Sequence, residues 1–86
     1  MRKFTEEEIK EKAKGNQPLY IVSQEPECDE VYVVAVTEED GKYWQIKYSV
    51  SLSSPMGAII AYDQEAPEVE RYLENSYIER WVIKED

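Results

Sequence analysis

The sequence predicts one small α+β domain, in which an antiparallel sheet of four or five strands is packed on one face by a helix. Three observations predict it: a helix start signal in the first ten residues, strict alternation of apolar and polar residues over 43–52, and a change to spacings of three and four after residue 63. The chain has 86 residues, which permits a single domain over 1–86. The order of the strands is left open.

A short helix is predicted near the N-terminus. Thr5 followed by Glu8 is a capping box, and Phe4 and Ile9 occupy the two positions of a hydrophobic staple. The helix should stop near Gly15-Asn16, a left-handed C-terminal cap. Its apolar stripe is short, so we expect it to lie at an end or edge of the sheet.

The next prediction is a β-hairpin made of residues 31–37 and 43–52. The first segment is rich in β-branched residues, the second alternates, and Asp40-Gly41 between them is a two-residue turn signal. The alternation assigns one set of side chains to the core: Trp44, Ile46, Tyr48, Val50 and Leu52. The other set should face water: Tyr43, Gln45, Lys47, Ser49 and Ser51.

The sequence also predicts a strand and a loop before this hairpin and another strand after it. Residues 19–22 resemble a strand, and residues 24–30, which contain a proline, are expected to form an acidic loop. Residues 57–62 are apolar on both faces, which is typical of a central strand or one covered by a helix.

The C-terminal third is expected to supply the packed helix. Over residues 64–76, Pro67, an acidic first turn and apolar residues at spacings of three and four all favour a helix. Residues 78–84 fit either its continuation or a fifth strand. We favour the strand, because Trp, Val and Ile are poor helix formers.

Charge and cysteine content exclude several functions. The 19 acidic and 10 basic side chains give a net charge of −9, which repels phosphate backbones and anionic lipid, so we expect neither direct nucleic-acid binding nor a membrane role. The apolar run at 58–62 is far shorter than the roughly 20 residues that span a bilayer. A single cysteine and the lack of a signal sequence favour a cytoplasmic protein.

The residue types needed for catalysis are scarce, and we expect no enzyme. The chain has no histidine, and its three glycines stand apart, so no phosphate-binding glycine loop exists. Lys47 and Ser49 lie two apart on one predicted strand face, a spacing that alternation produces by chance. Neighbouring carboxylates weaken Cys28 as a nucleophile, and the acids around it match no calcium loop. We therefore predict no catalytic residue, metal or cofactor.

What remains is a distribution of acidic residues in three clusters. The first is Glu25, Glu27, Asp29 and Glu30, the second Glu38, Glu39 and Asp40, and the third Glu65, Glu68, Glu70 and Glu74, with Asp63 beside them. Acidic side chains spread over a surface in this way can imitate a phosphate backbone, and they can steer the protein electrostatically to a basic partner. Tyr43, outside the core face, is a candidate aromatic anchor for that partner.

Two functions are compatible with these features. The first is a non-enzymatic inhibitor or regulator that presents an acidic, nucleic-acid-mimicking surface to a basic protein such as a nuclease or defence effector. The alternative is an accessory or assembly domain, homodimeric through a sheet edge, whose acidity serves only solubility.

Overall fold

The protein is built mainly of β-strands, as its computed structural model shows for residues 1–14, 20–53, 56–75 and 78–84. The elements are, in order, β1 (Arg2–Phe4), α1 (Glu6–Ala13), β2 (Tyr20–Glu27), β3 (Glu30–Glu39), β4 (Lys42–Ser51), β5 (Ile59–Ile60), β6 (Gln64–Ala66), β7 (Glu68–Asn75) and β8 (Ile78–Ile83). α1 has eight residues, and no helix in these ranges is long and apolar enough to cross a bilayer.

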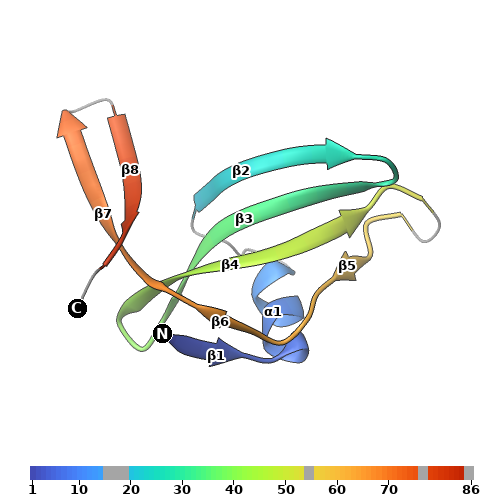
Figure 1. Cartoon of the computed structure of the whole chain (residues 1–86), viewed down its shortest axis with the longest axis horizontal. Coiled ribbons are helices and arrows are strands. Elements are labelled where there is room, and N and C mark those ends of the chain that lie inside the picture. Colours follow the sequence, from blue (N-terminus) through green and yellow to red (C-terminus); the bar gives the residue numbers. More distant parts are fainter. Residues whose placement is uncertain (15–19, 54–55, 76–77, 85–86) are drawn as a thin grey trace.

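The strands form a large curled sheet and a small one (Figure 1). The large sheet is antiparallel with the order β2-β3-β4-β7-β8, and β5 pairs with the far end of β4. The small sheet pairs β1 with β6. In Figure 1 the β7–β8 hairpin projects from one end of the large sheet, while α1 lies on the other side of β4. The five-strand path is therefore an open half-barrel.

The predicted β3–β4 hairpin is confirmed, and two tight turns determine its register. Asp40 and Gly41 have φ values of 56° and 78°, the left-handed pair that a type I′ turn requires. At the other end of β3, Cys28 has a φ of 55° in the turn from β2. The predicted core face of β4 is also confirmed up to Val50, whereas Leu52 lies beyond the strand and is 44% exposed. The prediction that the other face of β4 meets water is wrong except at Lys47: Ser49 and Ser51 are buried, and Tyr43 and Gln45 are half-buried.

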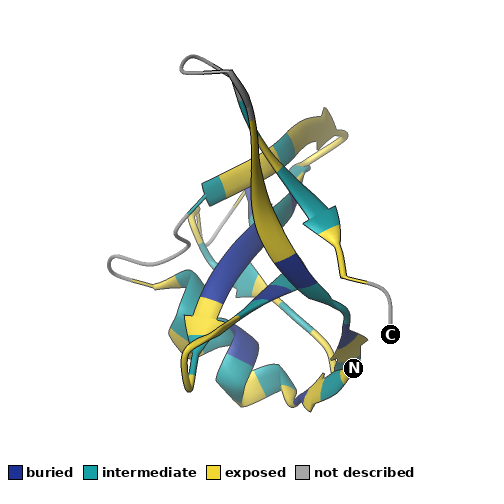
Figure 2. Ribbon diagram, turned by 90° about the vertical axis from the view of Figure 1, so that its left-hand side faces the viewer, coloured by how far each residue is buried: buried dark blue, intermediate teal, exposed yellow. Residues whose placement is uncertain are grey.

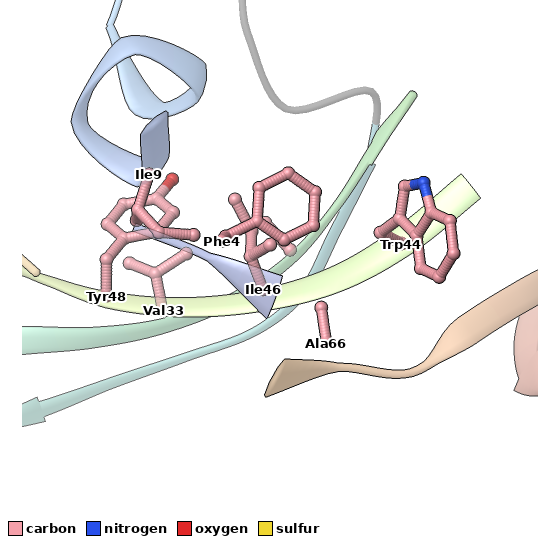
Figure 3. Close-up of a cluster of buried hydrophobic side chains, with 8 residues drawn as sticks. Phe4, Ile9, Val33, Trp44, Ile46, Tyr48 and Ala66 are labelled. Atoms are coloured by element: carbon pink, nitrogen blue, oxygen red, sulfur yellow. The ribbon is translucent and has the colours of Figure 1, made fainter. Parts of the chain in front are cut away.

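The N-terminal helix starts as predicted but packs more centrally than expected. The Thr5 hydroxyl accepts a hydrogen bond from the Glu8 N–H (3.2 Å), and the Glu8 carboxylate accepts one from the Thr5 N–H (3.0 Å). Phe4 and Ile9 are completely buried and lie over Ile46 and neighbouring side chains of the sheet (Figure 3). α1 is thus the helix that covers the sheet. The predicted cap at Gly15-Asn16 lies outside the described residues.

The helix predicted over residues 64–76 is wrong. Residues 64–75 form β6 and β7 on either side of Pro67, and residue 76 lies outside the described ranges. A spacing of four, as between Val69 and Leu73, places residues on one face of a strand as well as of a helix, so the pattern was ambiguous. Val69 lies opposite Tyr43 of β4 and is 1% exposed, whereas Tyr72 and Leu73 are half exposed. Residues 68–75 therefore form a strand rather than a helix because they pair with β4 on one side and β8 on the other.

Three other segments can be compared with their predictions. The strand expected at residues 78–84 is present as β8. The acidic loop expected at 24–30 is mostly strand, because β2 continues to Glu27 and tolerates its proline at the edge of the sheet. The strand expected over 57–62 is reduced to the two residues of β5, which pair only with β4 and do not form a central strand.

Candidate functional site

The first acidic cluster lies at the β2–β3 turn, and we call it the acidic tip: Glu25, Glu27, Asp29 and Glu30. The first three residues are exposed and the fourth is half-buried; Figure 2 shows the exposure of the strands. Glu27 and Glu30 are paired directly across the two strands, where like charges destabilise a sheet. Within the described residues no tip carboxylate has a cation within ion-pair distance.

The second cluster, at the opposite end of β3, is partly neutralised. Glu39 forms an ion pair with the Arg2 guanidinium (2.9 Å), which also binds Glu8 (3.0 Å). The Lys12 ammonium donates to the backbone carbonyl of Glu38 (3.1 Å) and brings another cation to this end. Glu38 and Asp40 remain exposed, so Glu39 is mainly part of the contact between β1, α1 and β3.

The third cluster is divided because its predicted helix does not form. Glu65 is on β6 opposite Lys3, and Glu68 on β7 forms an ion pair with Lys84 (3.5 Å). Glu70 is exposed on β7. The backbone of Glu74 belongs to β7, and its side chain lies outside the described residues.

Asp63, next to the third cluster, has a structural contact. Its carboxylate accepts a hydrogen bond from the Glu6 N–H (2.8 Å), the first residue of α1. A carboxylate at a helix N-terminus satisfies a free N–H and interacts favourably with the helix dipole. Asp63 therefore connects the segment before β6 to the start of α1.

Tyr43 is covered by the β7–β8 hairpin. The Trp81 ring of β8 lies with its centroid 5.0 Å from that of Tyr43 and 6.3 Å from that of Tyr20. Val36 and Val69 on the same face are almost completely buried. A second small apolar cluster thus forms on the face opposite α1, and it leaves Tyr43 half-buried and only partly accessible to a partner.

The same face also contains a cavity of about 150 Å³. Its lining residues come from β3, from β4 and from the segment before β6: Tyr32, Val33, Val34, Lys47, Tyr48, Ser49 and Tyr62. In the β3–β4 register Tyr32 lies opposite Ser49, and Val34 opposite Lys47. A neighbouring hollow of about 310 Å³ shares Lys47 and Tyr62 and continues towards Gln64 and Glu65. We call the 150 Å³ space the Lys47 cavity.

The Gln64 side chain holds two walls of this cavity together. Its amide oxygen accepts from the Lys47 N–H (2.8 Å), and its amide nitrogen donates to the Lys47 carbonyl (2.8 Å) and to the Tyr62 carbonyl (3.3 Å). The side chain thus pairs with the edge of β4 as a neighbouring strand's peptide group does. This edge lies between the pairing of β4 with β7 and its pairing with β5.

The chemistry of the cavity is that of binding. Lys47 and Ser49 share it, as their spacing predicts, but no hydrogen bond connects them, so the lysine is not positioned to activate the hydroxyl. The Tyr48 hydroxyl does not contribute to this chemistry, because its ring lies in the core beside Ile9 of α1 (Figure 3), where burial raises its pKa. No group of three or more acidic or cysteine side chains in the described ranges is arranged to hold a metal ion.

Sequence reasoning missed Tyr62 and Gln64. Alternation along residues 43–52 places Lys47 and Ser49 together, but no local pattern indicates that a segment fifteen residues later closes the cavity. Comparison of the chain with protein-family models, curated proteins and solved structures finds no match. The function is therefore argued from the geometry of the acidic tip and of the Lys47 cavity.

Proposed function

We propose that the protein is a non-enzymatic, cytoplasmic inhibitor or regulator that binds a basic partner protein through the acidic tip. The observation that carries the proposal is the set of tip carboxylates, which have no ion-pair partner within the described residues and include the directly opposed Glu27 and Glu30. The exposed, unpaired thiol of Cys28 in the same turn is compatible with a reducing compartment.

The electrostatic cost of the tip supports this role. Like charges directly opposite in an antiparallel pair destabilise it by up to about 1 kcal/mol. Residues 15–41 contain seven acidic residues and no basic one, so the rest of the β2–β3 hairpin does not offset the repulsion. A partner that supplies lysine or arginine side chains removes it and gains electrostatic steering during association.

The spacing of the acidic groups favours a partner that ordinarily binds nucleic acid. β3 has ten residues, which separates the tip from Glu38 and Asp40 by about 30 Å. Duplex DNA carries about 18 phosphate charges over that length. The hairpin has far fewer, so we expect it to occupy part of a phosphate-binding surface, as on a nuclease or defence effector, rather than to replace a whole duplex.

The alternative is an assembly domain that pairs through a sheet edge. β2 and β8 are the two edges of the five-strand path. β2 carries Pro26 and the exposed Glu25 and Glu27, which hinder pairing at its edge, whereas β8 offers an edge next to the exposed Ile83. Light scattering distinguishes the two: a mass that doubles with concentration supports assembly through β8, and a constant monomer mass contradicts it.

The proposed function is tested by affinity capture from a lysate of the source organism or its host, followed by mass spectrometry. We expect one basic protein that is released by high salt and by competing DNA, because screening and a true polyanion both weaken contacts with the tip. Glu27→Lys should abolish capture. Glu11→Lys, which makes the same charge change on an exposed position of α1, should leave it intact.

Two outcomes contradict the proposal. Capture that resists salt shows that the acidic residues do not carry the interaction. Equal loss with Glu27→Lys and Glu11→Lys shows that total charge, rather than the tip, controls binding. Circular dichroism of both variants checks that neither change unfolds the domain.

A further inference from the structure

We propose that the Lys47 cavity binds a small organic monocarboxylate that has a flat apolar body. The inference does not rest on the acidic tip, because none of the tip residues lines the cavity. It follows from a cation without an ion-pair partner in the described residues, a nearby hydroxyl and an apolar lining on the face of the sheet opposite α1, together with a hydrogen-bonded frame at the edge of β4.

Lys47 supplies the positive charge. Like several other lysines, it makes no ion pair within the described residues, but it is the described cation that lines this cavity. In a protein with a net charge of −9, a cation without a partner at the wall of a cavity is a local site for an anion.

Ser49 supplies a second donor. The residue is 7% exposed, it lines the cavity, and its hydroxyl makes no hydrogen bond to any described group. The hydroxyl oxygen is not among the fully buried atoms without a partner, so it is open to the cavity and can donate to a ligand oxygen. Lys47 and Ser49 are two residues apart on one strand face, about 7 Å, and the long lysine side chain reaches across that gap. A carboxylate over β4 can accept from both.

The remaining walls select the body of the ligand. Tyr32, Val34 and Tyr62 give the cavity a mainly apolar surface, and both tyrosine rings are about half exposed at its rim. Aromatic rings of this kind favour a flat partner in an offset or edge-to-face arrangement.

The charge of the ligand is limited to one. Among the described residues that line the cavity Lys47 is the one cation, and the neighbouring hollow is lined by the acidic Glu65. A second negative charge on the ligand meets that carboxylate and the excess negative charge of the protein. A monocarboxylate therefore fits better than a phosphate or a dicarboxylate.

The frame of the cavity is formed before any ligand binds. Gln64 holds the backbone on both sides of the Lys47 side chain and the carbonyl of Tyr62 by three hydrogen bonds of 2.8–3.3 Å. Preorganisation of this kind lowers the conformational cost of binding.

The test is a titration of ¹⁵N-labelled protein, followed by two-dimensional NMR, with phenylacetate and its neutral analogue phenylacetamide. We expect phenylacetate to shift the amide signals of residues 32–34, 47–49 and 62 with a dissociation constant on the order of 1 mM, as suits about ten non-hydrogen atoms. Phenylacetamide should bind about tenfold more weakly, because it lacks the charge.

Variants separate the proposed contacts from general effects. Lys47→Gln should weaken phenylacetate binding about tenfold and remove the preference for the acid over the amide, and Ser49→Ala should weaken it by about threefold. Lys42→Gln makes the same charge change on the same strand outside the cavity and should have no effect. The spread of amide signals in each free variant checks that it is folded.

The proposal is overturned by any of three results. These are the absence of saturable shifts at residues 32–34, 47–49 and 62, equal affinities for the acid and the amide, and equal effects of Lys47→Gln and Lys42→Gln. Because the readout is local to the cavity, none of them bears on whether the acidic tip binds a protein.

Discussion

Replacing Gln64 with alanine removes a side chain that acts as a strand partner for β4. The amide of Gln64 pairs with both the N–H and the carbonyl of Lys47 at 2.8 Å. Each such hydrogen bond contributes about 0.5–1.5 kcal/mol net. Both bonds are exposed, so water replaces part of the loss, and we expect Gln64→Ala to lower the free energy of unfolding by about 1–2 kcal/mol.

The assay is thermal and urea unfolding followed by circular dichroism. For a domain of this size, about 1–2 kcal/mol corresponds to a decrease in melting temperature of roughly 5–15 °C. Gln45→Ala is the matched control, because Gln45 is also half-buried on this face and its side chain makes no hydrogen bond to a described residue. We expect its effect to stay within about 0.5 kcal/mol.

A second variant tests the direction of the hydrogen bonds. Gln64→Glu keeps an acceptor for the Lys47 N–H but places a carboxylate oxygen against the Lys47 carbonyl, where the amide nitrogen now donates. It should be at least as destabilising as Gln64→Ala at neutral pH, and should recover as the new carboxyl is protonated below about pH 4. Equal stability of Gln64→Ala and Gln45→Ala, or a Gln64→Glu variant as stable as the parent protein, refutes the assignment.

Two further predictions concern the turn from β2 and the N-terminal cap. Cys28→Gly should raise the free energy of unfolding by about 0.5–1 kcal/mol in urea titrations, since glycine adopts a φ of 55° without strain, whereas Asp29→Gly should not stabilise the protein. The Thr5 N–H, and after it the Arg2 guanidinium, hold the pKa of the Glu8 carboxyl below its ordinary value of 4.5. The stability that this carboxylate contributes is therefore complete above pH 4.5 and lost as the pH falls through the lower folded-state pKa, so urea midpoints between pH 2 and 6 should depend less on pH in Glu8→Gln. An unchanged pH profile in that variant contradicts the second prediction.

The parts of the fold that sequence predicts well are those determined by neighbours in the chain. The capping box of Thr5 and Glu8 and the Asp40-Gly41 turn each lie within four residues, and both form as expected. Alternation over residues 43–50 identifies the core face because one side of β4 is buried under α1. For the same reason it correctly places Lys47 and Ser49 on one face.

The parts that sequence does not predict depend on distant partners. Around Val69 the spacing of apolar residues fits a helix, and the strand forms because β4 and β8 supply partners on both sides. Tyr72 and Leu73 are half exposed, so the alternation of a buried strand is absent there. The wall of the cavity at Tyr62 and the contact of Trp81 with Tyr43 arise from the curl of the sheet, which no short window of sequence records.

The pairing of β1 with β6 has a consequence for the order in which the chain acquires structure. Arg2 lies opposite Ala66, so this contact closes a loop of more than sixty residues, and such closure is among the slower steps of folding. Phe4 and Ile9 are buried against strands that are synthesised later, and Asp63 caps α1 from the far side of the same loop. The N-terminal helix, although it has the clearest local signal, is therefore completed only after residue 66 is available. During synthesis on the ribosome, α1 emerges before the strands against which it packs, and it is among the last elements to be fixed in place.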